Sequence, residues 1–386
     1  MDRKVLFRNI TISKNYKYSL FSLGKEGQLY IQKCGITYHD RDKSTQGFTL
    51  YARNAGKQVW LINMEGDVVH EWQTTGGTTN FNYLRENGNL FICEKVDEGP
   101  GVVSGKSGRM REYDWDGNVV WEHLDDHQHH DARRLENGNA VYIAWKELTP
   151  AQSKKVKGGI PDSELNGKVY CDVIREVDQK GNIIWEFSND YNEFFDKYYI
   201  NPLAPREEYG HANTIFPMAD GNYLISYRVF DLLVIVDRKT GKLIWEYQNH
   251  SLGGQHDCQE LENGNILVFA NGYNTPANSN PGPNFSQVWE IDPITNEIVW
   301  KYFSKRNPLN FWSPHISGCQ RLKSGNTLIC EGGKGRIFEV TPDGEIVWEY
   351  INPFFGPHPA YTDSEINWVF RAKRYSSDSP QIQNRV

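Results

Sequence analysis

A hairpin signature that recurs along the chain limits the folds open to it. Around Asn263-Gly264-Asn265 an apolar strand runs into Asn-Gly, the strongest short hairpin signal, and a second apolar strand follows. The same signature occurs at Asn87–Asn89, Asn137–Asn139, Asp220–Asn222 and Ser324–Asn326. Such self-similarity predicts a repeat architecture in which each repeat is one supersecondary unit.

A second repeated pattern is a β-prone segment that ends in tryptophan next to a charged residue. Its copies end at Trp72, Trp121, Trp185, Trp245, Trp300 and Trp348. They lie 48 to 64 residues apart, which matches the period of propeller blades. Because aromatic residues at fixed blade positions usually fill the space between neighbouring sheets, we interpret these tryptophans as core residues.

Together the two patterns predict an all-β, six-bladed β-propeller. In each blade, strand A leads into the Asn-Gly turn, strand B follows it, and strand D ends at the tryptophan. The sixth blade is split, because Asn367–Tyr375 resembles a strand A and Phe48–Tyr51 resembles a strand B. Pairing these two segments closes the ring and removes open sheet edges. We therefore expect an N-terminal arm at residues 1–45, the propeller at 46–375 and a flexible tail at 376–386.

Composition narrows the function classes. The net charge of −7, with acids and bases mixed throughout, argues against a nucleic-acid surface. The six cysteines show no CxxC spacing, so we expect packed thiols rather than a disulfide framework. The first 24 residues lack the apolar core of a signal peptide, and no apolar run reaches membrane-spanning length. We therefore expect no membrane partner and a cytoplasmic location, or a periplasmic one if a leader has been removed.

Four histidines stand at the predicted starts of strands A: His130, His211, His256 and His315. Strand A lines the central channel of a propeller, so these side chains are expected to meet at one mouth of the channel. His358, just before the sixth strand A, is a weaker candidate. Convergent histidines are typical of acid–base, nucleophilic or metal chemistry.

Polar residues near these histidines complete the candidate site. Asn213 and Arg228 can donate hydrogen bonds to an oxyanion, and Ser226 and Asn271 lie beside them at strand ends. Asp131 and Asp257 directly follow two of the histidines. In a regular strand Asp257 points to the face opposite His256, so we expect it to fix a loop or a neighbouring imidazole.

The run Asp125–Asp131 has the composition of a metal site. In a regular strand His127 and His129 would share one face and His130 would take the other. That alternation argues against one tight three-histidine site, because zinc needs its ligands on one side. We therefore interpret His127 and His129 as residues of a solvated loop.

Three stretches resemble the arylsulfotransferases of the bacterial propeller type. They are His211-Ala212-Asn213 with Ser226-Tyr227-Arg228, then His256-Asp257 with Phe269-Ala270-Asn271-Gly272, and finally Trp312-Ser313-Pro314-His315. The resemblance spans most of residues 46–375. The chain departs from the family pattern where Ala270 replaces an aspartate, and no arginine follows Asn271 within Tyr273–Pro276.

The resemblance implies a six-bladed propeller that moves a sulfuryl group between phenols through a sulfated histidine. It implies that His315 is the nucleophile and that His211 and His256 hold the sulfuryl oxygens, with Arg228 and Asn213 also catalytic. His130, Asn271 and Ser226 would contact the substrate, a small aromatic or anionic molecule. No cofactor is required, because positioning and charge neutralisation suffice for this chemistry.

Two alternatives remain open at this level. In the first, His130, His211, His256 and His315 hold a divalent metal ion, as in metal-dependent propeller lyases and oxygenases. In the second, the propeller binds a ligand without catalysis. The oligomeric state is not predicted.

Overall fold

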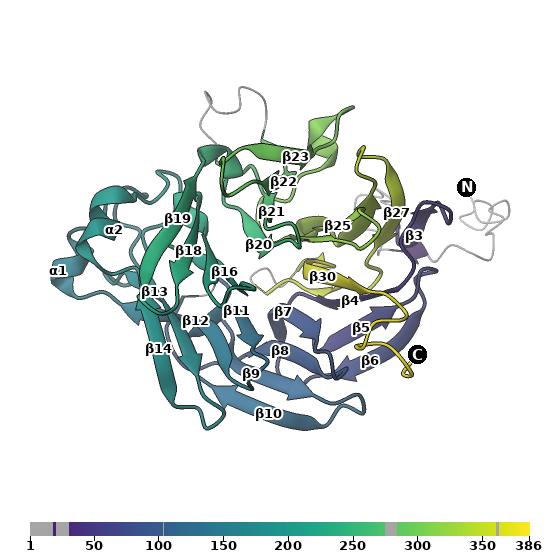
Figure 1. Ribbon diagram of the computed structural model, residues 1–386, viewed down its shortest axis with the longest axis horizontal. Helices are drawn as coiled ribbons and strands as arrows, with labels where there is room; N and C mark the ends of the chain where they lie inside the picture. The colour runs from purple at the N-terminus through teal and green to yellow at the C-terminus, as the bar shows by residue number, and fades with distance from the viewer. Residues whose placement is uncertain (1–17, 21–30, 103, 275–283, 360–362) are drawn as a thin grey trace, which may run out of the picture.

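A ring of six antiparallel sheets forms the body of the protein in the computed structural model (Figure 1). The structure describes residues 18–20, 31–102, 104–274, 284–359 and 363–386. Four of these sheets consist of consecutive strands in meander order, and each of the other two adds one strand from the opposite end of the chain. The sheets follow one another around a central axis. The predicted six-bladed β-propeller is confirmed.

The blades consist of the following strands. Blade 1 contains β30 (Val369–Tyr375), β4 (Phe48–Arg53), β5 (Gln58–Ile62) and β6 (Val68–Gln73). Blade 2 contains β7 (Thr78–Leu84), β8 (Leu90–Lys95), β9 (Gly108–Tyr113) and β10 (Val119–Leu124). Blade 3 contains β11 (Gln128–Arg134), β12 (Ala140–Glu147), β13 (Tyr170–Val177) and β14 (Ile183–Ser188), with β15 (Glu208–Tyr209) parallel to β13.

The remaining blades have the same plan. Blade 4 contains β16 (Ala212–Pro217), β17 (Tyr223–Tyr227), β18 (Leu232–Asp237) and β19 (Lys242–Gln248). Blade 5 contains β20 (His256–Glu260), β21 (Ile266–Ala270), β22 (Gln287–Ile291) and β23 (Ile298–Tyr302). Blade 6 contains β24 (Gly318–Arg321), β25 (Thr327–Glu331), β26 (Arg336–Val340), β27 (Ile346–Ile351) and a fifth strand, β3 (Gly35–His39).

Short elements lie outside the blades. Two small sheets pair β1 (Tyr18–Leu20) with β2 (Ile31–Lys33) and β28 (Gly356–Pro357) with β29 (Glu365–Ile366). The helices are α1 (Pro150–Ser153), α2 (Asn192–Lys197) and the 3-10 turns η1 (Arg228–Phe230), η2 (His250–Leu252), η3 (Pro308–Asn310) and η4 (Gly332–Lys334). None of the helices in the described ranges is both long and apolar enough to cross a bilayer.

The ring closes where the sequence predicted. Strand β30 pairs antiparallel with β4, with Ala372 opposite Tyr51 and Tyr375 opposite Phe48. The last strand of the chain thus becomes the inner strand of blade 1, so β4 has a partner on both sides. Closure joins the two ends of the chain in one sheet and covers the inner edge of β4.

A buried carboxylate on strand C joins each of four blades to the next one. Glu176 of blade 3 accepts a hydrogen bond from Asn139 of its own hairpin at 2.8 Å and contacts Arg238 of blade 4 at 2.6 Å. Glu290 does the same with Asn265 and with Arg321 of blade 6, both at 2.7 Å. The equivalent carboxylates in blades 2 and 6 are Glu112, with Asn89 and Arg134, and Glu339, with Asn326 and Arg374. The recurring Asn after each turn is therefore part of the inter-blade packing.

The strand-D tryptophans pack between blades, in keeping with their interpretation as core residues. Trp72 and Trp348 are fully buried. The guanidinium carbon of Arg374, from blade 1, lies 4.3 Å from the ring centroid of Trp348 in blade 6. Arg134 covers Trp121 in the same way at 4.0 Å. Such cation–π contacts strengthen partly desolvated interfaces.

Both ends of the chain differ from the expected arm and tail. Within the expected arm, Gly35–His39 is the outer strand β3 of blade 6 rather than a separate element. In the expected tail, Ile382 is buried in the core cluster between blades 1 and 2, and Arg385 donates a hydrogen bond to the backbone oxygen of Asn87. The tail is anchored because its one isoleucine fills an apolar gap.

Two long insertions follow strands of blade 3, the first between β12 and β13 and the second between β14 and β16. The segments 148–169 and 189–211 pack together through a hydrophobic cluster that includes Leu148, Val156, Phe194 and Tyr198. The second insertion ends in β15, which pairs with β13 and delivers Glu208 to the start of strand A of blade 4.

We predict that ring closure is required for soluble folding. A chain ending before Asn367 lacks β30, so β4 becomes an exposed edge and the apolar face of blade 1 is opened. This truncation should give aggregated protein in expression trials and size-exclusion chromatography.

A smaller perturbation serves as the control for this truncation. Ile382→Ala removes only a buried side chain outside the sheets and should cost about 2–5 kcal/mol of unfolding free energy while leaving a soluble monodisperse protein. A soluble, cooperatively folded truncation would contradict the role of β30.

Candidate active site

The inner strands of blades 3, 4 and 5 are bulged close to their first residues. The register shifts between His129 and Ala132 in β11, between Ala212 and Thr214 in β16, and between His256 and Gln259 in β20. His130 and His211 have positive φ angles of 52° and 51°. A side-chain-bearing residue in this region is strained, and bulges and strain of this kind re-aim side chains at functional sites.

A layer of buried charge crosses the channel directly behind the histidines. Asp131 accepts the backbone N–H of Ile215 in blade 4, and Asp257 accepts the backbone N–H of Cys319 in blade 6. The Arg371 guanidinium of blade 1 bridges the two carboxylates, at 3.0 Å from Asp131 and 3.3 Å from Asp257. The sequence predicted that Asp257 would fix a loop or a neighbouring imidazole, but in the structure it holds strand β24 and Arg371 instead.

His256 is held by an amide of its own blade. Its Nδ1 lies 2.8 Å from Oδ1 of Asn271, whose Nδ2 donates hydrogen bonds to the Ser313 backbone oxygen and to Ser317 Oγ. Because those two bonds fix the orientation of the amide, Oδ1 must be the acceptor and His256 Nδ1 the donor. Neutral His256 therefore carries its lone pair on Nε2.

His211 is held by a carboxylate from the insertion of blade 3. Its Nδ1 lies 2.6 Å from Oε2 of Glu208, and the other oxygen of Glu208 accepts a hydrogen bond from Trp145 Nε1 at 2.8 Å. Burial opposes ionisation of Glu208, but the adjacent His211 and this hydrogen bond hold its pKa below the usual value. The ionised Glu208 fixes Nδ1 of His211 as the donor.

His130 is held by a second, deeper histidine. Nδ1 of His130 lies 2.8 Å from Nδ1 of His129, and the His129 ring stacks on Trp145 at a centroid distance of 4.4 Å. His129 is fully buried, so the prediction that it belongs to a solvated loop is wrong. Strand β11 is the inner strand of blade 3 and is buried on both faces from Gln128 to Arg133, so alternation along it exposes none of these side chains. His127 alone is partly exposed, 2.6 Å from Asp126.

Three imidazoles therefore offer Nε2 at the same mouth. His130 and His211 have ring centroids 4.6 Å apart. In the described part of the chain, Nε2 of His130, His211 and His256 has no hydrogen-bond partner, yet these atoms are not sealed from solvent. Burial, together with neighbouring imidazoles and Arg228, lowers the pKa of His130 and of His256 well below the ordinary value. Both rings are neutral at pH 7.

The sequence suggested that His315 stands at the start of a strand, but it lies in the loop before β24. It is partly buried, and its ring meets Trp368 edge-on at a centroid distance of 4.7 Å, while His358 contacts the same indole at 5.0 Å. Burial and the charge of Arg228 lower the pKa of His315 to about 4. Neither ring nitrogen of His315 is engaged by another described residue.

Arg228 is the cation shared by this cluster. Its charge acts on His130, His256 and His315, and with His211, Ser104 and Glu207 it lines a cavity of about 130 Å³. That is roughly the liquid volume of four water molecules at about 30 Å³ each. Among the described residues, none forms an ion pair or side-chain hydrogen bond with its guanidinium. An unpaired arginine facing a cavity is a site for an anion.

Three other predicted site residues act mainly within the protein. Asn213 is buried and donates a hydrogen bond to the Gln255 backbone oxygen, and Ser226 Oγ accepts one from the Gln255 side chain. Asn271 orients His256, as described above. The structure thus groups His130, His211, His256, His315 and Arg228 around the mouth, with these three residues behind them.

Sequence reasoning missed four residues that hold the imidazoles: Glu208, Trp145, His129 and Asp172. Glu208 could have been suspected from its position three residues before His211. Trp145 and Asp172 lie on inner positions of β12 and β13, where the pattern indicates only core.

The residues of the mouth do not fit a bound metal ion as they stand. Tetrahedral ligation requires nitrogen atoms within about 2.0–2.1 Å of one ion, hence within about 3.5 Å of one another. In the described ranges, the one group of three or more ligand atoms within 4.8 Å of each other is Asp125, Asp126 and His127, outside the mouth.

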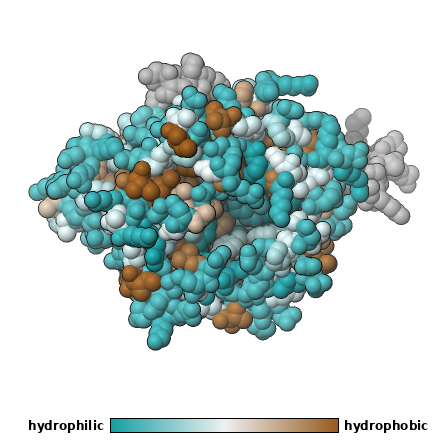
Figure 2. Space-filling model, viewed as in Figure 1, coloured by the Kyte–Doolittle hydropathy of each residue, from teal (hydrophilic) through white to brown (hydrophobic). Residues whose placement is uncertain are grey.

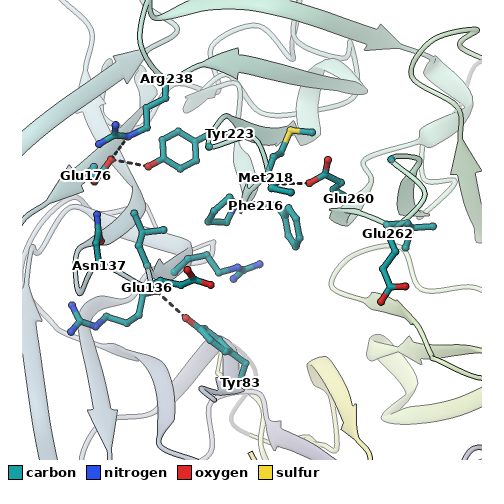
Figure 3. Close-up of a pocket in the computed structure, with 18 residues that line it drawn as sticks. Tyr83, Glu136, Asn137, Glu176, Phe216, Met218, Tyr223, Arg238, Glu260 and Glu262 are labelled. Atoms are coloured by element: carbon teal, nitrogen blue, oxygen red, sulfur yellow. Dashed lines mark hydrogen bonds and ion pairs between the residues drawn. The ribbon is translucent and has the colours of Figure 1, made fainter. Parts of the chain in front are cut away.

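A larger cavity of about 950 Å³ opens at the other end of the same strands (Figure 3). Its lining includes Glu136, Phe216, Met218, Glu260 and Glu262, which Figure 3 labels. The face shown in Figure 2 is largely hydrophilic, with apolar side chains in small separate patches. The described lining of this cavity includes no histidine.

All six cysteines are buried and none forms a disulfide, as the spacing predicted. Burial raises the pKa of the Cys171 and Cys258 thiols, so these thiols stay protonated at pH 7.

We predict that acid destabilises the protein through these histidines. A histidine with a folded pKa below its unfolded value gives stability that is complete above about pH 6.5 and is lost as pH falls toward the folded pKa. Between pH 7 and 5, His130 and His256 should each contribute a slope of up to about 1.4 kcal/mol per pH unit. Urea unfolding of His256→Gln at several pH values should show a shallower slope than the wild type.

His250 provides the matched comparison for this experiment, because Asp231 raises its pKa. Its contribution has the opposite sign, so His250→Gln should make the loss of stability on acidification steeper. Equal slopes in all three proteins would contradict the assignment.

Comparison with known proteins supports this picture. The model of the arylsulfotransferase (ASST) family matches residues 128–353, which is more than half of the chain. A crystal structure of a protein of unknown function from Bacteroides caccae aligns with 16% identity and a TM-score of 0.53, covering 85% of this chain and 98% of that one. A search of curated protein sequences gives no match.

Two propeller lyase structures align less closely. A streptogramin B lyase covers 82% of each chain with 14% identity and a TM-score of 0.48. A catalytically inactive virginiamycin B lyase from Staphylococcus aureus, with quinupristin, covers 87% of this chain and 88% of that one with 12% identity and a TM-score of 0.47. The family match spans all four predicted histidines and Arg228, and the chain belongs to the arylsulfotransferase family.

Proposed function

We propose that the protein transfers a sulfuryl group from an aryl sulfate to a phenolic acceptor, with His315 as the group that carries it. The observation that supports this best is the Arg228 guanidinium, which has no ion-pair partner among the described residues and lines a small cavity together with His211. Its charge also acts on His130, His256 and His315. The three oxygens of a sulfuryl group share a negative charge. Sulfuryl transfer needs a cationic hydrogen-bond donor for these oxygens, a neutral nucleophile and little else.

His315 is suited to the nucleophile's role. With a pKa of about 4 it is neutral at pH 7, and its ring nitrogens have no partner among the described residues. Trp368 packs against its ring and limits its rotation. Arg228 acts on it electrostatically and would neutralise the charge that develops on the transferring oxygens.

His211 and His256 are assigned to the sulfuryl oxygens, but their tautomers set a condition. Each ring uses its Nδ1 proton internally and carries a lone pair on Nε2 when neutral. To donate to an anionic oxygen from Nε2, a ring must first take up a proton. Anion binding should therefore be coupled to proton uptake.

The metal-dependent lyase or oxygenase is the weaker interpretation, because the ligand atoms at this mouth are too far apart to meet at one ion. For the same reason the proposed mechanism uses only the residues of this chain.

The first test concerns the covalent intermediate. Wild-type protein incubated with 4-nitrophenyl sulfate alone should release one equivalent of nitrophenol and gain one sulfuryl mass on His315, as measured by intact-mass and peptide mass spectrometry. His315→Ala should lose both, with unchanged circular dichroism and melting temperature. Loss of activity on chelation in the wild type, or full turnover in His315→Ala, would overturn the assignment.

The second test concerns the anion site and its coupling to protons. Sulfate should bind the wild type more tightly as pH falls from 7 to 5, with up to two protons taken up, one for each of His211 and His256, as measured by calorimetry in buffers of different ionisation enthalpy. Arg228→Met should weaken binding by about 10²–10³-fold, the cost of losing a charge-assisted donor.

Lys239→Met is the matched control for this measurement, since it removes the same charge from an exposed turn of the same blade. It should leave sulfate affinity unchanged. Equal losses in both variants would mean that sulfate responds only to overall charge.

A further inference from the structure

We propose that His130 is the acid–base group of this site and that His129 and Asp172 position it through a buried chain of polar contacts. This inference rests on the proposed sulfuryl transfer for its substrate, but its geometry can be tested without any activity. The sequence suggested a substrate-binding role for His130, and neither His129 nor Asp172 was assigned a role.

The chain of contacts begins at Asp172 on β13. Asp172 and His129 are both almost completely buried, and Nε2 of His129 lies 3.4 Å from Oδ1 of Asp172. That distance is long for a hydrogen bond, but Nε2 of His129 has no other partner in the described part of the chain. Buried polar groups are very rarely left unpaired, so we infer that each is the partner of the other.

The pairing of Asp172 with His129 fixes the tautomers of His129 and His130. If His129 donates from Nε2 to the carboxylate, its Nδ1 carries the lone pair and accepts the Nδ1 proton of His130, 2.8 Å away. His130 is then left with a lone pair on Nε2, the atom that is open to the mouth. Asp172 thus determines, through His129, that the basic nitrogen of His130 is Nε2.

The protein holds this chain rigidly. Trp145 stacks on His129 with only 12° between the ring planes and also donates to Glu208, so one indole orients the supports of both His130 and His211. The backbone of Gly105 lies directly on the His130 ring, where an added Cβ would stand 2.1 Å from Cε1. A Cβ at Gly210 would stand 2.2 Å from Oδ2 of Asp172.

The chemical step follows from these positions. As the acceptor oxygen attacks sulfur, the N–S bond of the sulfated histidine breaks and its electron pair returns to the imidazole. The acceptor O–H bond breaks and its proton binds Nε2 of His130. The Nδ1 proton of His130 then passes to Nδ1 of His129, whose Nε2 proton passes to Asp172. Burial raises the pKa of Asp172, which helps this carboxyl to hold the proton.

The primary test reads the tautomers directly. In wild-type protein labelled with ¹⁵N-histidine, long-range ¹H–¹⁵N spectra should show His130 with its proton on Nδ1 and His129 with its proton on Nε2, the signals being assigned by their loss in His130→Gln and His129→Gln. The opposite tautomer of His130 overturns the proposal, whether or not sulfuryl transfer occurs. If the tautomers are as expected but no aryl sulfate reacts, the contact chain stands and the proposed function fails.

A second test uses Asp172→Asn, which keeps the shape of the side chain. Its amide can donate to His129, which should invert both tautomers and lower turnover by about 10²–10⁴-fold, the usual contribution of general acid–base catalysis. The loss should be large for weakly acidic acceptor phenols and small for phenols already ionised at the assay pH. The burst of nitrophenol from the donor should persist, since a good leaving group needs no proton.

Tyr227→Phe is the matched control, because Tyr227 is buried close to Asp172. Its hydroxyl has no hydrogen-bond partner among the described residues. This substitution should leave the tautomers and the dependence on acceptor acidity unchanged. An Asp172→Asn defect that is uniform across all acceptors, with the burst lost as well, would indicate a merely structural role and overturn the proposal.

Discussion

The buried carboxylate on strand C is the interaction on which the ring depends. Hydrogen bonds within a β-sheet do not set its angle to the neighbouring sheet. A propeller therefore needs contacts between blades that fix this angle. Glu176 and Glu290 provide them by binding an asparagine of their own hairpin and an arginine of the following blade. Leaving such a buried carboxylate without its arginine would cost several kcal/mol, which favours one arrangement of the blades.

Buried charge pairs also lie at the centre of the ring, where they hold the histidines of the candidate active site in place. Asp131 and Asp257 lie one residue beyond His130 and His256, and Arg371 ties both carboxylates to blade 1. The bulges that turn these histidines toward the mouth are therefore pinned from behind by charge pairs and backbone hydrogen bonds. The strained backbone at His130 and His211 persists because the surrounding contacts fix it.

One design recurs among the histidines of the mouth. Nδ1 of His130, His211 and His256 is occupied by His129, Glu208 and Asn271, respectively, and Nε2 is left open. The three supporting side chains differ in charge, so the histidines that they hold suit different tasks. A carboxylate favours a ring that gains a proton, whereas an amide orients a ring without stabilising its charged form. Such a set can combine anion holders and a base around Arg228.

The sequence by itself determined the blade count, the closure by β30 and the convergence of four histidines, because these follow from local signals: Asn-Gly turns, period-2 strands and a fixed repeat. Only the tertiary structure decided which side chains support them. His129 was assigned to a solvated loop, but it lies on the inner strand β11, which is buried on both faces. Glu208 and Asp172 reach the site through insertions and inner strands whose pairing no local pattern encodes. Ile382 is anchored by a gap between two blades that exists only once the ring has closed.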